Sequence, residues 1–294
     1  MNLSMKKVLL TLFIFCAILG QAQDPNFSQT YSVPMLINPA LAGSTGAARF
    51  SSVARDQWPN INNGVKSLYV AYDQMVNKLK SGIGFYFVGE DLYTQVKSKR
   101  MALNYSLPFN LSKEKKLKFA PAVELAYQER KLVDSLFLAV KDEVNNVMIY
   151  PQVLRDKVST FDIGTGFLLN NERLNLGIIG KHLMQPDMSF TGIKEQMLMR
   201  LSLITDYTFG KLDEKKAWKF APGLKVNYVN SKTDVTITAA AVYHKFRFGF
   251  AYRNDANDTR NNAAMMQLSY NGLIFKFRYA YDFYTQKING SASG

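Results

Sequence analysis

Apolar and polar residues alternate along most of this chain with a period of two, which is the pattern of β-strands rather than of helices. The nine residues FKFRYAYDF, Phe275 to Phe283, place five aromatic side chains on one face of an extended strand. The other face carries Lys276, Arg278, Ala280 and Asp282. The same alternation recurs in KLKFAPAVELAYQ, WKFAPGLKVNY and FRFGFAYR, so the chain is predicted to be all-β.

Thirteen such segments are predicted as strands of an antiparallel, up-and-down sheet. They span residues 47–55, 67–73, 81–88, 96–107, 116–130, 159–169, 174–181, 197–209, 218–230, 234–243, 246–253, 262–270 and 273–283. One face of each is bulky and apolar, whereas the other mixes Gly and Ala with Lys, Arg, Asn and Glu. This pattern is typical of a transmembrane outer-membrane β-barrel, whose tilted strands need about ten residues to cross the bilayer. A soluble β-sandwich shows the same periodicity, and alternation alone does not separate the two folds.

The first 22 residues are predicted to be a secretory signal peptide. Lys6 and Lys7 form its positive region, Val8 to Leu19 its apolar region, and Ala22 the cleavage position. The apolar region is too short for a membrane anchor, which needs about 20 apolar residues. The only cysteine, Cys16, lies within it, so the exported chain has no disulfide. Export, the lack of cysteine and the strand lengths favour the barrel over the sandwich.

The connections between the predicted strands alternate in length. Residues 170–173, 244–245 and 271–272 are predicted to be tight turns at the periplasmic end. Asn271-Gly272 is the strongest of these signals, because both residues tolerate positive φ in a two-residue hairpin. Longer segments near 131–158, 182–196 and 254–261 are predicted to be extracellular loops, as in other outer-membrane barrels.

The number of predicted strands conflicts with barrel topology. A bacterial single-chain barrel has an even number, with both chain ends in the periplasm. Either one strand is miscounted, or a last strand is missing. The loop-like tail from Asn289 to Gly294 favours a missing strand, and about 14 strands in the full protein. The expected organisation is a signal peptide at 1–22, an N-terminal periplasmic or lumen segment at 23–46, and a β-barrel at 47–294 that is truncated at its C-terminus.

Three motifs at the start of the mature chain carry a family resemblance. They read DPNFSQ from Asp24 to Gln29, NPALAG from Asn38 to Gly43, and RDQWP from Arg55 to Pro59. Together they resemble the PorP/SprF family of Bacteroidota outer-membrane proteins, with looser matches along the rest of the chain. The candidate site residues, for structure or partner contact, are Asp24, Pro25, Phe27, Ser28, Gln29, Asn38, Pro39, Gly43, Arg55, Gln57, Trp58 and Pro59.

This resemblance implies an outer-membrane β-barrel that works with the type IX secretion system and gliding. It also implies a partner, a secreted cargo protein that is exported or anchored at the cell surface through its C-terminal domain. Other type IX components in the periplasm and outer-membrane lipid are further expected partners. Relatives continue past a Ser-Gly pair into a final strand, so the resemblance supports a strand missing after Ser293 and Gly294.

No residue pattern predicts catalysis. The chain has two histidines, His182 and His244, and no spacing of His, Cys, Asp and Glu that indicates a metal site. It also has no nucleophile elbow and no phosphate-binding glycine loop. His182 with Asp187 and Ser189 is the one imaginable hydrolase set, but a loop histidine near turn residues explains it better. The protein is therefore predicted not to be an enzyme and to bind no cofactor or metal.

The formal net charge of +13 has a local origin. Lysines cluster at predicted periplasmic turns, and Arg247, Lys276 and Arg278 are predicted to point inward. An exported protein rarely meets nucleic acid. Acidic lipid headgroups, an acidic periplasmic partner, an anion-preferring lumen or simple solvation of the turns are the remaining explanations. A porin-like channel for small solutes, anionic ones included, is therefore the alternative function. The clustered lysines are Lys113, Lys115, Lys116, Lys118, Lys215, Lys216 and Lys219.

Overall fold

The fold was analysed in a computed structural model of the chain. It describes residues 27–59, 64–92, 95–133, 140–142, 147–149, 153, 155–211, 214, 217–256 and 259–285. The predicted signal peptide at 1–22 and two candidate site residues, Asp24 and Pro25, lie outside the described residues. Among the described residues, no helix is long and apolar enough to cross a membrane.

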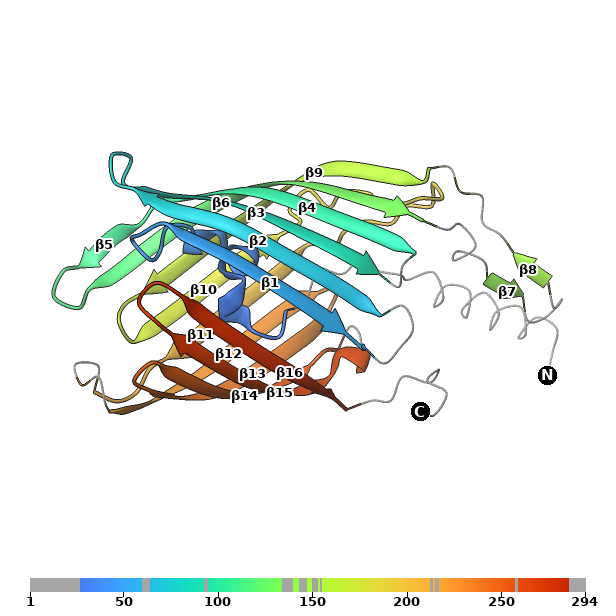
Figure 1. Ribbon diagram of the computed structural model, residues 1–294. Coiled ribbons are helices and arrows are strands. Elements are labelled where there is room, and N and C mark those ends of the chain that lie inside the picture. Colours follow the sequence, from blue (N-terminus) through green and yellow to red (C-terminus); the bar gives the residue numbers. More distant parts are fainter. Residues whose placement is uncertain are drawn as a thin grey trace.

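A fourteen-stranded antiparallel sheet forms the body of the protein (Figure 1). All thirteen strands expected from the alternation are present and in the expected order, and most of their ends are shifted by a few residues. A separate two-stranded sheet pairs β7 (Val140–Asp142) with β8 (Val147–Ile149). The strands of the large sheet are β1 (Arg49–Gln57), β2 (Val65–Val76), β3 (Ser81–Leu92), β4 (Val96–Ser106), β5 (Phe109–Ser112), β6 (Leu117–Leu132), β9 (Lys157–Asn170), β10 (Leu174–Lys181), β11 (Arg200–Tyr207), β12 (Trp218–Val229), β13 (Lys232–Tyr243), β14 (Phe246–Asn254), β15 (Ala263–Asn271) and β16 (Lys276–Tyr284).

Strand β5 was not expected from the sequence. Both β4 and β5 pair with β6, β4 along its second half and β5 along its first residues. Pro108 separates the two strands, and a proline has no N–H to donate to a ladder. Strand β5 therefore continues β4 along one edge of β6, and the path across the sheet has thirteen positions.

The bulky face of the sheet points outward. On β14, Phe248 and Phe250 are 49% and 62% exposed, whereas Ala251 on the other face is 6% exposed. On β16, Phe277 and Tyr279 are exposed in the same way. A soluble sandwich would bury its bulky faces between two sheets, so this arrangement excludes the sandwich. It fits a β-barrel whose apolar outer surface contacts lipid.

Short turns lie together at one end of the sheet. The turns at 171–173 and 244–245 join β9 to β10 and β13 to β14, as predicted. The prediction for Asn271-Gly272 was wrong. Strand β15 ends at Asn271, which pairs with Lys276, so a four-residue turn separates them. Neither Asn271 nor Gly272 has a positive φ. The prediction failed because the apolar pattern of the strand continues into the turn. The turn has an exposed apolar tip and ends at Phe275.

The two edge strands of the sheet are β1 and β16. Within the described residues, β1 pairs only with β2, and β16 only with β15. Because every step across the thirteen positions is antiparallel, β1 and β16 run in the same direction, as Figure 1 shows. We call the line between them the seam. A strand placed in the seam would be antiparallel to both neighbours.

The outward face should tolerate a charge much less well than the inward face. We expect Phe250→Lys to lower the free energy of unfolding in lipid vesicles by about 2–4 kcal/mol, the cost of a lysine facing the middle of a bilayer. Thr238→Lys is the matched control, because Thr238 lies on the inward face of the neighbouring strand β13. Denaturant titration of both variants measures the difference. Equal losses would show that Phe250 does not face lipid.

Candidate functional site

An N-terminal segment, residues 27–46, lies against the inner face of the sheet, and we call it the plug. It contains η1 (Thr30–Ser32), α2 (Pro34–Ile37) and η2 (Pro39–Leu41), and Figure 1 shows it enclosed by the curved sheet. Its apolar side chains form a core with small and aromatic residues of the wall. That core comprises Phe27, Val33, Met35, Leu36, Ala42, Tyr69, Ala71, Tyr86, Val88, Ala102 and Ala126.

Prolines and an asparagine shape the middle of the plug. Pro34 begins α2 and Pro39 begins η2, where a missing N–H costs nothing. The Asn38 side chain caps η2, because its Oδ1 accepts a hydrogen bond of 2.9 Å from the Ala40 N–H. Its Nδ2 donates to the Phe167 carbonyl of β9 at 3.2 Å. The second motif thus fixes the turn between two helices and ties it to the wall.

Glycines in the wall make room for the plug. A Cβ on Gly82 would lie 2.0 Å from the Ala42 carbonyl oxygen, and one on Gly84 would lie 2.1 Å from Met35 Sδ. A Cβ on Gly166 would lie 2.2 Å from Asn38 Oδ1. All three distances are shorter than any side chain could accept. The wall therefore holds the plug where three inward positions have no side chain.

An ion pair fixes the end of the plug. Gly43 has a φ of +66°, and its N–H donates to Asp73 Oδ2 at 2.8 Å. Arg49 Nε binds the other oxygen of this buried carboxylate at 2.8 Å, and Arg49 Nη2 donates to the Leu41 carbonyl at 3.0 Å. Asp73 therefore joins the plug to β1 and β2 at once.

The first motif attaches the plug to the last two strands. Gln29 Nε2 donates to the Tyr279 carbonyl of β16 at 2.5 Å, and Gln267 Nε2 of β15 donates to the Ser28 carbonyl at 3.0 Å. The Phe27 ring packs edge-on against Tyr69 of β2, with centroids 6.2 Å apart. Residues 27–29 therefore reach from β2 to β16, across the seam.

The third motif joins the two edge strands through side chains. Arg55 Nη2 of β1 donates to Tyr284 OH at 2.9 Å and lies 3.3 Å from Asp282 Oδ2, both on β16. Asp282 also lies 3.3 Å from Arg253 Nη2. Next to this pair, the Trp58 ring lies 5.8 Å from the Tyr284 ring. The seam is therefore bridged by a charge network where no backbone ladder is present between the described residues.

The remaining candidate residues have simpler positions. Gln57 Nε2 donates to Asn261 Oδ1 at 2.9 Å, which ties β1 to the loop before β15. Pro59 is exposed, and no contact in the structure explains its place in the motif. The candidate residues therefore do not form one pocket. They hold the plug against the wall and bridge the seam.

A buried charge network on the inner wall was missed at the sequence level. Arg100 Nη2 lies 2.7 Å from Glu124 Oε1 and 3.3 Å from Asp162 Oδ2, and Lys181 Nζ lies 3.7 Å from Glu124. These four residues come from four strands, each at an inward position of the alternation. The sequence marks each as inward, but only the register between strands brings them together.

His182 lies at the start of the loop that follows β10, beside turn residues, as predicted, but it is buried. It follows β10 directly, is 3% exposed, and its Nδ1 lies 2.7 Å from Asp162 Oδ2. The carboxylate that binds His182 Nδ1 is therefore Asp162 of β9, whereas Asp187 Oδ1 accepts hydrogen bonds from the Ser189 and Glu195 backbone N–H groups. No group of three or more metal-ligating side chains occurs among the described residues. His182 is therefore part of the buried charge network.

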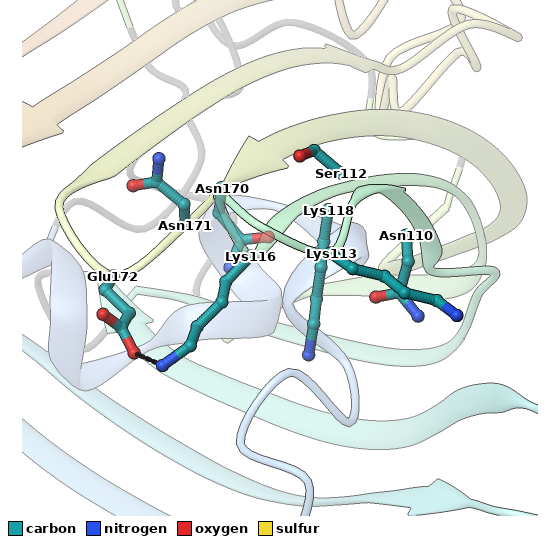
Figure 2. A pocket seen from close by; sticks show the side chains of 8 residues that line it. All are labelled: Asn110, Ser112, Lys113, Lys116, Lys118, Asn170, Asn171 and Glu172. Carbon is teal, nitrogen blue, oxygen red and sulfur yellow. Dashed lines mark hydrogen bonds and ion pairs between the residues drawn. The ribbon is translucent and has the colours of Figure 1, made fainter.

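A basic pocket lies at the end of the short turns (Figure 2). Lys116 Nζ forms an ion pair of 2.6 Å with Glu172 across its mouth. Lys113 and Lys118 add two further positive charges, so the predicted lysine cluster is partly gathered here. Lys215 and Lys216 lie outside the described residues. The residues that line the pocket are Asn110, Ser112, Lys113, Lys116, Lys118, Asn170, Asn171 and Glu172.

Tyr31 lies on the side of the plug that faces β14. Its ring lies 4.9 Å from the Arg247 guanidinium carbon. Tyr31 is 38% exposed inside the sheet, yet the surrounding wall desolvates its hydroxyl. Burial therefore raises the pKa of this hydroxyl, and the nearby Asp206 carboxylate raises it further. Tyr31 stays a neutral hydrogen-bonding group over the range in which proteins work.

The sheet and the plug define a class, a transmembrane β-barrel whose inner face holds its own N-terminal segment. The family described as "Type IX secretion system membrane protein PorP/SprF" matches residues 19–294. The chain belongs to this family, as its three motifs indicated, and is an outer-membrane component of type IX secretion. No curated protein matches the chain.

One solved structure similar to the chain is BamA from Haemophilus ducreyi lacking POTRA domains 1–3. The TM-score is 0.41 at 11% sequence identity, with 83% of this chain covered. The chain spans 62% of the length of that structure. A TM-score this low does not support a fold assignment. The fold is instead assigned from the strand register and the outward apolar face.

The fit between plug and wall can be tested with one methyl group. Gly166→Ala places a Cβ against Asn38, so we expect a loss of about 1–3 kcal/mol in the free energy of unfolding, the usual cost of overpacking. We also expect faster entry of neutral sugars into proteoliposomes, because the plug loses its seat. Gly164→Ala on the same face of β9 is the control, since its Cβ would meet nothing closer than 3.4 Å. Identical behaviour of the two variants would show that the plug is not seated there.

The charge network at the seam should contribute more to the free energy of unfolding than an exposed ion pair does. Asp282→Asn leaves Arg55 and Arg253 without their shared carboxylate, so we expect unfolding to become easier by about 3 kcal/mol. Glu172→Gln removes one partner of the exposed pair with Lys116 and should cost less than about 1 kcal/mol. Denaturant titration at neutral pH compares them. A loss at Asp282 no larger than that at Glu172 would rule out a stabilising bridge across the seam.

Proposed function

We propose that this protein helps to export or anchor a partner surface protein, through the C-terminal domain of that partner. Family membership supports the general role in type IX secretion. The observation that carries the specific role is the plug, which lies on the inner face and is tied to β2, β9 and β16. A general porin keeps a water-filled channel, whereas an occupied inner face is better suited to a binding component.

The two ends of the barrel offer different surfaces to partners. The two longest connections, after β6 and β10, and the connection after β14 lie at one end, and the lysine-lined pocket lies at the other. With the short turns in the periplasm, the long loops meet the cargo outside and the lysines meet other type IX components inside. Exposed lysines would favour an acidic periplasmic surface.

A porin-like channel is the second candidate function. It draws support from Lys276 and Arg278, whose side chains are solvent-exposed on the inner face of β16. Cations on the wall of a channel attract anionic solutes. The plug weighs against this function, because it is fixed by buried contacts to several strands rather than lying loosely in the lumen.

Quantitative proteomics of a strain that lacks the gene tests the proposal. We expect one or a few proteins to disappear from the cell surface or the medium, while the rest of the secreted proteins stay unchanged. Complementation with the wild-type gene or with Gly164→Ala should restore them, whereas Gly166→Ala should restore them less well.

An unchanged set of secreted and surface proteins would overturn the proposed role. Rapid uptake of small anions by proteoliposomes of the wild-type protein would then make the porin-like channel the better explanation.

A further inference from the structure

The inner wall is divided into a neutralised half and a basic half. Helices α2 and η2 of the plug pack on β3, β4, β6 and β9, where Arg100 faces Glu124 and Asp162. Strands β12, β14 and β16 instead carry inward cations. The register places Arg247 of β14 opposite Ser269 of β15, and Ser269 opposite Arg278 of β16, so the two arginines share one row across the sheet.

The cations of this row lie near one another, and the Asp206 carboxylate acts on Arg247 from beyond ion-pair distance. Arg278 is close enough to Arg49 and Arg247 to be repelled by their charges, and Lys276 is repelled in the same way by Arg278 and Arg49. Arg247 stacks on Tyr31, and its Nη2 atom is buried without a hydrogen-bond partner. Four positive side chains therefore lie near one another on β1, β14 and β16.

The nearby carboxylates are engaged elsewhere. Asp73 binds Arg49 and the Gly43 N–H from opposite sides. Asp206 accepts a hydrogen bond of 2.9 Å from Asn175 and lies near Tyr31. Neither is within ion-pair distance of Arg247, Lys276 or Arg278. A group of like charges with an unsatisfied guanidinium nitrogen is unfavourable until an anion joins it.

We propose that this row of cations binds an acidic, extended segment of another polypeptide. Backbone spacing favours such a ligand over one small anion. Arg247 and Arg278 are two strands apart, about 10 Å, and Lys276 and Arg278 are two residues apart, about 7 Å. Alternate carboxylates of an extended chain have the same spacing of about 7 Å. Lipid headgroups do not reach an inward face.

This inference deepens the proposed function by naming the chemistry of a partner segment. It rests on the proposed function only for the expectation that the barrel meets exported polypeptides. The plug leaves this wall accessible, because Lys276 and Arg278 remain solvent-exposed beside it. Charge attraction of this kind weakens as salt rises, so binding should too.

The test uses the full chain in nanodiscs of neutral phosphatidylcholine and a fluorescent peptide of ten glutamates. We expect binding, measured by fluorescence anisotropy, to weaken at least tenfold in the double variant Arg247→Gln, Arg278→Gln. The double variant Lys113→Gln, Lys115→Gln removes the same charge from an exposed turn and should change binding less than twofold. Arg247→Lys, Arg278→Lys keeps the charge and should keep most of the affinity.

A second experiment measures thiol labelling and leaves every Arg and Lys of the row in place. Ala280→Cys introduces a thiol on the inward face of β16, two residues from Arg278, into a chain whose only other cysteine is Cys16. The glutamate peptide should slow labelling of this thiol by a neutral maleimide.

Four results would overturn the inference, and the first three concern the peptide alone. They are absence of binding, an equal loss in the turn variant, and unprotected labelling of the new thiol. Inorganic phosphate that competes as well as the peptide would also overturn it, since the site would then take small anions. None of these results would alter the proteomics of the deletion strain, so the two proposals fail separately.

Discussion

The backbone hydrogen bond in lipid is the constraint on which this structure depends. A strand that crosses a bilayer has no water to satisfy its N–H and C=O groups, so each strand must pair with neighbours on both sides. Thirteen positions of antiparallel pairing meet this need everywhere except at β1 and β16. The first and third motifs act at that place, where Gln29 binds a backbone carbonyl of β16 and Arg55 binds its side chains.

The same constraint explains the contents of the barrel. Because aromatic side chains occupy the outer face, the polar side chains of the strands must point into the barrel. The interior must then be filled by protein or by water. The plug fills one half where wall side chains are absent, since Gly82, Gly84 and Gly166 leave room for a backbone carbonyl, a sulfur atom and a side-chain amide oxygen. The close fit makes the plug part of the wall, and it is the physical basis for the binding role proposed for this component of type IX secretion.

The charged side chains of the interior also differ between the half that the plug fills and the other half. Behind the plug, Arg100 is compensated by Glu124 and Asp162 in a buried network. Arg247 instead stacks on Tyr31 of the plug and Arg278 is exposed on β16, and neither forms an ion pair with a carboxylate of the described residues. Burying an uncompensated charge costs more than burying a pair, which favours solvent or a ligand beside these two arginines.

The sequence by itself determined thirteen of the strands, their order and which side chains share a face, because the period of two reports on each strand alone. It also located Gln29, Asn38 and Arg55 through their motifs, without saying what they touch. Only the tertiary structure decided the pairing of Arg55 with Asp282 and of His182 with Asp162, and the seating of Asn38 against Gly166. Those contacts join residues far apart in the chain, and they follow from strand register and barrel curvature, which no local pattern encodes.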